Sequence, residues 1–304
     1  MSVTVYALLL TLCTVSGDPT GCTYYPSDLK YECSARSWAL PLTLSDFDHV
    51  PQSLSLIDVN GNLPSSTPTA TFSGFAAINT SSFDANFVPT FTIRCYRGGM
   101  LIYYAGSFTG LGYFKNVHIQ NCEVLAMPDD GLHDFGDVNY FGVEGGIIGD
   151  IGYDAFRGLN VCLMNIPRPL GTFLLTSKLD SRVLPNGVLY ALTNVTNIVI
   201  DNANLDTLQV DMFQASTKLK SLSLRYNMFT TIPNNTLSSL PGLQTLDIEG
   251  IELECTCDNV WFLDYCKANN ISIRGSVICS TPSSYRSKYT ESSSCFVIKE
   301  QDFQ

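Results

Sequence analysis

The chain has 304 residues, of which 45% are hydrophobic and 15% are charged, and its formal net charge is -11 at pH 7. This composition excludes a disordered polymer, which has few apolar residues and many charges. The acidic balance argues against nucleic acid and anionic membrane surfaces as partners. It fits a soluble secreted protein, or one with a cation-rich partner.

The N-terminal stretch, residues 1–17, has an apolar run that ends in the small residues Ser16 and Gly17. It is typical of a secretory signal peptide, although a basic start is lacking. No later stretch approaches the roughly 18 apolar residues of a membrane span. We therefore expect a released, extracellular chain with no membrane span. Sequons of the type N-x-S/T predict glycosylation at Asn79, Asn194, Asn234 and Asn270.

The most regular stretch is 219–242, LKSLSLRYNMFTTIPNNTLSSLPG, and the phrase begins again at Leu243 with LQTLDIEG. A short alternating run, SLSL, is followed by wider apolar spacing, with Asn227 in the middle and Pro233 later. This indicates a strand, a turn and a looser return segment. The stretch resembles an extracellular leucine-rich repeat, LxxLxLxxNxLxxLPxxxFxxLxx. The resemblance implies an α/β solenoid, a horseshoe with a concave parallel β-sheet, a mostly irregular or short-helical convex side and disulfide-capped ends.

Residues 18–53 resemble a sparse N-terminal cap of such an array, with two cysteines where many caps have four. The first repeat of a solenoid has an apolar face without a neighbour, and a disulfide-braced flap covers it. We pair Cys22 with Cys33.

Residues 54–250 can be divided into about eight repeats with a period of about 24 residues. Two repeats, 78–113 and 162–194, are long. In the first, either a loop is inserted or the strand lies around Ile93 and Cys95; in the second, we expect the strand at Phe173 to Ser177. The position of the repeat asparagine, which bonds backbone groups of the turn, is occupied by Asn62, Asn86, Cys122, Gly146, Leu179, Ala203, Asn227 and Ile251.

Cysteines also lie inside the array, at Cys95, Cys122 and Cys162. We interpret them as small buried apolar residues, with bridges within the array as the alternative. Cys266, further on, has no obvious partner either.

The C-terminal segment, residues 251–304, contains LECTCDNVWFLDYC followed by two later cysteines. It resembles the C-terminal cap of Toll ectodomains and variable lymphocyte receptors. By that resemblance Cys255 pairs with Cys279, and Cys257 with Cys295. Trp261 and Phe262 are expected to close the open end of the last repeat. A zinc site is the competing interpretation, but a secretory route favours oxidation and C-x-C suits a tetrahedral zinc knuckle poorly.

Catalytic and cofactor motifs are lacking: the sequence has no G-x-S-x-G, no H-E-x-x-H, no phosphate-binding loop and no dinucleotide fingerprint. We therefore predict no enzyme, no metal and no cofactor. Binding should fall on outward residues of the concave strands, because side chains alternate along a strand. Those we predict for ligand binding are Asn116, His118, Tyr140, Glu144, Phe173, Leu175, Asp201, Arg225, Asp247 and Glu249. Leu56 is also expected to point outward.

Two features stand out on that predicted face. Tyr140, Phe173 and Leu175 form a central apolar strip, and Asp201, Asp247 and Glu249 surround Arg225. The leading hypothesis is a secreted protein that recognises a protein or glycan ligand through its concave face, in innate recognition by its resemblance to variable lymphocyte receptors. The alternative is an extracellular-matrix component or a non-catalytic accessory subunit. The ligand and the oligomeric state stay open.

Overall fold

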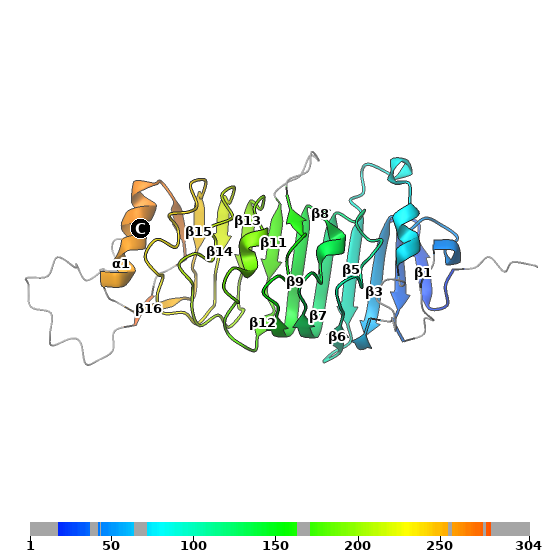
Figure 1. Ribbon diagram of the computed structural model, residues 1–304, viewed down its shortest axis with the longest axis horizontal. Helices are drawn as coiled ribbons and strands as arrows, with labels where there is room; N and C mark the ends of the chain where they lie inside the picture. The colour runs from blue at the N-terminus through cyan, green and yellow to red at the C-terminus, as the bar shows by residue number, and fades with distance from the viewer. Residues whose placement is uncertain are drawn as a thin grey trace, which may run out of the picture.

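The computed structural model describes residues 18–36, 42, 44–63, 72–162, 171–254, 257–275 and 278–280. Strands lie side by side along the long axis of the molecule, beginning with β1 near one end, and the helix α1 lies near the other end (Figure 1). They form a 14-stranded sheet whose neighbouring strands are parallel, apart from the antiparallel pair β1 and β2. The main path of the sheet consists of β1 (Cys22–Tyr25), β2 (Lys30–Ser34), β3 (Ser53–Val59), β5 (Thr90–Cys95), β7 (Asn116–Met127), β9 (Tyr140–Ile151), β11 (Thr172–Leu175), β13 (Asn197–Ile200), β14 (Ser221–Ser223), β15 (Thr245–Asp247) and β17 (Ser272–Arg274).

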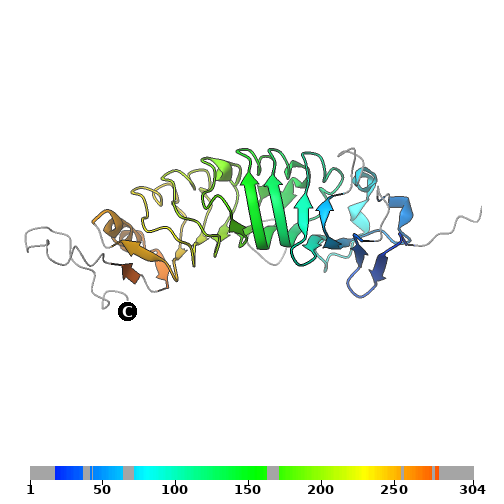
Figure 2. The ribbon, with the colours of Figure 1, turned by 90° about the horizontal axis from the view of Figure 1, so that it is seen from below.

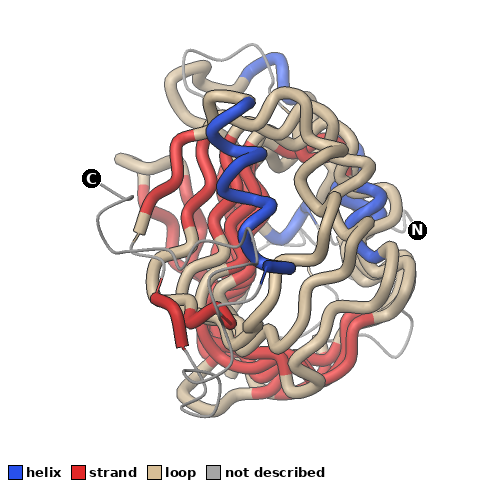
Figure 3. Tube along the Cα trace, turned by 90° about the vertical axis from the view of Figure 1, so that its left-hand side faces the viewer, coloured by secondary structure: helices blue, strands red, loops and turns tan. Residues whose placement is uncertain are grey.

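Two strands, β7 and β9, are 12 residues long and turn a corner. The second half of β7 pairs with β6 (Met100–Ile102), which pairs in turn with β4 (Gly61–Asn62), and the second half of β9 pairs with β12 (Lys178–Leu179). Together these strands form a second bank of the sheet. At the corner Asn121 and Gly145 have φ values of 56° and 66°, a left-handed backbone that Asn and Gly tolerate best. Figure 3, which looks along the long axis, shows the two banks of strands and the loops that complete each coil.

The side opposite the sheet is made of loops and short 3-10 helices, as expected for the convex side (Figure 2). The 3-10 helices are η1 (Leu44–Asp46), η3 (Ser73–Ala77), η4 (Thr80–Ser82), η5 (His133–Phe135) and η6 (Val188–Ala191). Two separate two-stranded parallel sheets lie outside the main sheet. They consist of β8 (Asp137–Val138) with β10 (Asn160–Val161), and of β16 (Glu252–Glu254) with β18 (Ile278–Ser280). The α-helix α1 (Cys257–Ala268) follows β16.

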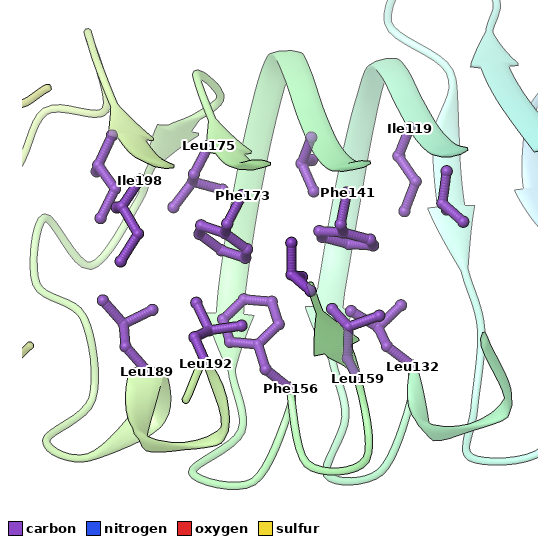
Figure 4. Packing of buried hydrophobic residues seen from close by; sticks show 14 of the residues in the cluster. Ile119, Leu132, Phe141, Phe156, Leu159, Phe173, Leu175, Leu189, Leu192 and Ile198 are labelled. Atoms are coloured by element: carbon purple, nitrogen blue, oxygen red, sulfur yellow. The ribbon is translucent and has the colours of Figure 1, made fainter. Parts of the chain in front are cut away.

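The core is a continuous apolar layer between the strands and the return segments. Phe141 and Phe173 stack with ring centroids 5.9 Å apart, and Phe156 meets the edge of Phe173 at 5.0 Å. Figure 4 shows strand residues such as Ile119 facing return-side residues such as Leu132 across this layer. Burying such side chains is the main stabilising term, because each removes a large apolar area from water.

Asn227 takes the role expected of the repeat asparagine. Its Oδ1 accepts from the backbone N–H groups of Ala203 (3.0 Å) and Leu205 (3.1 Å), and its Nδ2 donates to the carbonyls of Ile200 (2.6 Å) and Leu224 (2.8 Å). These bonds satisfy backbone groups of two neighbouring coils that no strand partner reaches.

Asn86 does not take that role, so this assignment was wrong. Its side chain is exposed and donates to Asp84 in a turn before β5. The strand of the first long repeat is therefore β5, which contains Ile93 and Cys95, and the extra residues precede it. The strand of the second long repeat, β11, begins at Thr172.

The outward orientation predicted for Leu56, Phe173 and Leu175 was also wrong, since all three are fully buried. Phe173 is in register with Phe141 and Ile198, and it therefore points into the core. Side chains alternate along a strand, so an error of one residue in the register of an irregular repeat moves a residue to the opposite face.

Two disulfides occur among the described residues. Cys22 pairs with Cys33, as predicted, and braces the β1–β2 hairpin at the N-terminal end. Cys95 pairs with Cys122 and links β5 to β7, so the interpretation of these two residues as unpaired buried side chains was wrong and the alternative, a bridge within the array, holds. Cys162 and Cys266 are free thiols.

The C-terminal end places Phe262 in the core, and Trp261 Nε1 donates to the carbonyl of Ile232 at 2.7 Å. Both residues thus cover the last repeat, as expected. The signal peptide lies outside the described residues. In each of the pairs Cys255–Cys279 and Cys257–Cys295, one residue lies outside the described residues and the side chain of the other is not described. These pairs and the boundaries 18–53, 54–250 and 251–304 stay predictions.

Candidate functional site

The outward face of the main-path strands, here called the sheet face, carries most of the residues predicted for binding. Asn116 and His118 lie on β7, and Tyr140 and Glu144 lie on β9, all half-buried. The strand register brings these four side chains together, because Asn116 is paired with Tyr140 and the position of His118 with Gly142. Of the other predicted residues, Phe173 and Leu175 lie on β11 and point into the core, Asp201 and Arg225 follow β13 and β14, and Asp247 and Glu249 lie at the end of β15 and just after it.

A cluster of three side chains occupies the centre of the sheet face. Glu144 Oε1 lies 3.0 Å from His118 Nδ1 and also accepts from the Tyr140 hydroxyl at 3.0 Å. The rings of His118 and Tyr140 stack with centroids 4.5 Å apart. Burial, and then the charge of Glu144, raise the pKa of Tyr140 above its usual range, so the phenol keeps its proton and remains a donor.

Gly142 leaves the space that the Tyr140 side chain occupies. A Cβ at this position would lie 2.5 Å from the Tyr140 hydroxyl. The Tyr140 side chain therefore lies along its own strand and reaches Glu144 only because residue 142 has no side chain. The cluster presents a half-buried aromatic ring and a carboxylate at the surface.

The acidic group around Arg225 is mostly an internal network. Asp201 is 5% exposed; its Oδ2 accepts from Arg225 Nε (2.9 Å) and its Oδ1 from the Ser223 hydroxyl (2.7 Å). Hydrogen bonding to Asp201 is the main reason that the pKa of Arg225 is raised. Asp201 thus orients Arg225, whereas Asp247 is half-buried and Glu249 exposed at the surface.

The apolar residues of the central sheet face are Val199, which the sequence places outward, and Leu174, which the sequence reasoning missed. Both are half-buried, and the register pairs Gly142 with Leu174 and Leu174 with Val199. Together with Tyr140 they replace the predicted strip that contained Phe173 and Leu175. The signal that would have found Leu174 is the alternation of TFLL once Phe173 is taken as inward.

The four sequons lie off the main-path strands. The side chains of Asn79, Asn234 and Asn270 are exposed, whereas Asn194 is half-buried. The Asn194 Nδ2 donates to Asn160 Oδ1 at 3.0 Å, and its Oδ1 accepts from Lys218 Nζ at 2.6 Å. Glycans at these positions would leave the sheet face open, and their presence stays a prediction.

Over the described ranges, no three His, Cys, Asp or Glu side chains are grouped as metal ligands would be. Nor does any helix within those ranges have the length and apolar character needed to cross a bilayer.

The stack of parallel strands, the backbone-bonding Asn227 and the disulfide-braced end define the fold as a leucine-rich-repeat solenoid. Residues 193–252 match the family model described as "Leucine rich repeat". The "Putative neurotrophin receptor LTRK 1" of Lymnaea stagnalis is 33% identical over 89 residues, which are 29% of this chain and only 11% of that relative. Human trophoblast glycoprotein, also titled Wnt-activated inhibitory factor 1, has a similar structure, with a TM-score of 0.56 and 17% identity over 90% of this chain and 95% of that chain.

The structural comparison supports the fold, and the disulfides indicate the compartment. At 17% identity the structural similarity shows the fold alone. Disulfides form and persist in oxidising compartments, so the bridges Cys22–Cys33 and Cys95–Cys122 indicate an extracellular or cell-surface protein.

Proposed function

We propose that the chain is a secreted binding protein that recognises a protein or glycan ligand through its sheet face, and that it is not an enzyme. The observation that carries this proposal is the central surface of Tyr140, Leu174 and Val199, which are half-buried rather than fully covered. Aromatic and aliphatic anchors surrounded by polar groups are the usual energetic centre of a binding surface.

The polar surroundings support the same role. His118 and Glu144 border the apolar centre on one side, and Asn197 borders it on the other. Arg225, held in place by Asp201, adds a fixed cation further along the sheet. Such pre-positioned groups give a ligand fixed hydrogen-bond partners at low entropic cost. Innate recognition is the biological role that the resemblance to variable lymphocyte receptors offers for this surface.

The test is capture by the immobilised full chain from extracellular fluid of the source tissue, with bound proteins and glycans identified by mass spectrometry. The double variant Leu174→Arg/Val199→Arg should lose the captured ligand, because two charges then occupy the apolar centre. Val210 and Met228, 51% and 52% exposed, lie off the main-path strands, so Val210→Arg/Met228→Arg is the matched control. Retention of the ligand by the first variant would refute binding at the sheet face.

A further inference from the structure

The first outward position of successive strands forms a row of one chemical kind. From β5 to β17 the register pairs these positions directly, strand after strand. Each of the eight residues carries a hydroxyl or a carboxamide, and none is charged: Thr90, Asn116, Tyr140, Thr172, Asn197, Ser221, Thr245 and Ser272. We call this set the hydroxyl–amide row.

Charged residues of the sheet face lie later on the strands or just after them, as Arg94 does on β5 and Arg225 does after β14. Arg94 lies 3.7 Å from Glu32, and Arg225 lies 2.8 Å from Asp201. The hydroxyl–amide row therefore runs beside the charged positions without containing any of them. A ligand along it would meet neutral hydrogen-bonding groups on every strand.

Several members of the row are free to bind. In the described part of the chain, the side chains of Asn116, Ser221, Thr245 and Ser272 make no hydrogen bond of their own. The Thr90 hydroxyl donates to the carbonyl of Val88 at 2.9 Å and keeps its acceptor capacity. Seven of the row members are half-buried and Ser272 is exposed, so the row is accessible along its length.

The chemistry of the row favours a polyhydroxylated ligand without charge. Hydroxyls and carboxamides both donate and accept, as sugar hydroxyls do, so the two surfaces can pair in many registers. Strands lie about 4.8 Å apart, so the row repeats regularly over roughly 34 Å. A linear polymer also repeats regularly, whereas a folded protein partner relies on a few irregular anchors. Tyr140, the third member of the row, adds an amphipathic ring against which the apolar face of a sugar can pack.

Charged polymers fit the row less well. The net charge of -11 repels an anionic polysaccharide. A cationic polymer would find no carboxylate in the row to pair with. We propose that the hydroxyl–amide row binds an uncharged linear glycan that lies along the axis of the solenoid. This inference rests on the proposed function, because it names the ligand class for the same sheet face.

The experiment is affinity electrophoresis of the full chain in gels that contain unbranched neutral β-glucan, β-mannan or α-glucan, with hyaluronan and chondroitin sulfate as charged comparisons. At least one neutral glycan should retard the chain, and retardation should persist between 50 and 500 mM NaCl. The variant Asn116→Ala/Asn197→Ala/Ser221→Ala/Thr245→Ala should weaken the interaction at least about ten-fold, because it removes several hydrogen bonds worth about 1 kcal/mol each.

The matched control is Thr193→Ala/Thr207→Ala/Thr217→Ala, which removes three exposed hydroxyls outside the strands and should bind as the unchanged chain does. Circular dichroism of both variants checks that they fold. Unchanged retardation of the row variant, retardation by charged glycans alone, or no retardation by any neutral glycan overturns the inference. If a protein is instead captured and lost in Leu174→Arg/Val199→Arg, the proposed function stands while the glycan row fails.

Discussion

Replacing Phe173 or its neighbour Leu174 by Ala tests the register of the irregular repeat that forms β11. Phe173 is fully buried between Phe141 and Phe156, whereas Leu174 is half-buried on the sheet face. Phe173→Ala removes the aromatic ring and leaves a cavity in the core, and we expect the free energy of unfolding to fall by about 3–5 kcal/mol. Loss of two aromatic contacts, each worth roughly 0.5–1.5 kcal/mol, is included in that figure.

Leu174→Ala removes half as many side-chain carbons as Phe173→Ala, from a position that water already reaches. The cavity contribution is then absent, and we expect a loss below about 1 kcal/mol. The two variants differ by one position in the sequence and by the side of the sheet they occupy. The contrast between them therefore reports which of the two side chains lies in the core.

The assay is urea denaturation followed by far-ultraviolet circular dichroism, with amide hydrogen exchange of β9, β11 and β13 as a local measure. Exchange is needed because repeat arrays can unfold in parts, and one midpoint then does not describe the whole chain. A larger loss for Leu174→Ala than for Phe173→Ala would refute the register described above and restore Phe173 to the surface.

Three further predictions concern other parts of the chain. Asn227→Ala deletes four buried hydrogen bonds of about 1 kcal/mol each, so the free energy of unfolding should fall by about 3–4 kcal/mol in urea denaturation. The pKa of Asp130 is lowered, mainly by its hydrogen bond to Arg157; its stabilising contribution is present above the ordinary carboxyl pKa and is lost as pH falls through the lowered value. Carboxyl NMR should show Asp130 titrating at higher pH in Arg157→Gln. Burial raises the pKa of the Cys266 thiol to about 11, so iodoacetamide at pH 8 should label half-buried Cys162 before Cys266 in the native chain.

Controls for these predictions come from the same regions. Gln244 is exposed, so Gln244→Ala should change stability by less than about 0.5 kcal/mol, and an equal loss in Asn227→Ala would show that the buried bonds contribute little. Asp154 also pairs with Arg157, at 2.8 Å, and Asp154→Asn should leave Asp130 with its low pKa. Equal labelling of the two thiols before denaturation would contradict the burial of Cys266.

The regular repeats show what local sequence can specify. In the stretch around Asn227, the alternating apolar residues, the asparagine and the return-side leucines all indicate the same coil, and the structure has this coil. The pairing of Cys22 with Cys33 was also accessible, because a short hairpin at the end of a solenoid has few other partners. Each of these features depends on residues close in sequence.

The remaining features depend on residues from different coils. Side chains alternate between the two faces of a strand, so a shift of one residue in a long repeat moves Phe173 from one face to the other. The sequence did not fix this register. Pairing with Phe141 and Ile198 on the neighbouring strands places Phe173 in the core. The bridge between Cys95 and Cys122 likewise requires two coils to stack in one register.

The sequence by itself therefore determined the kind of fold, the approximate place of each regular coil and the capped N-terminal end. Only the tertiary structure decided which side chains share the sheet face. Leu174 joins Val199 there, and the hydroxyl–amide row becomes continuous, because parallel strands from distant segments align their first outward positions. A surface made of one residue from each coil has no local signature, since its pattern exists only across the strands.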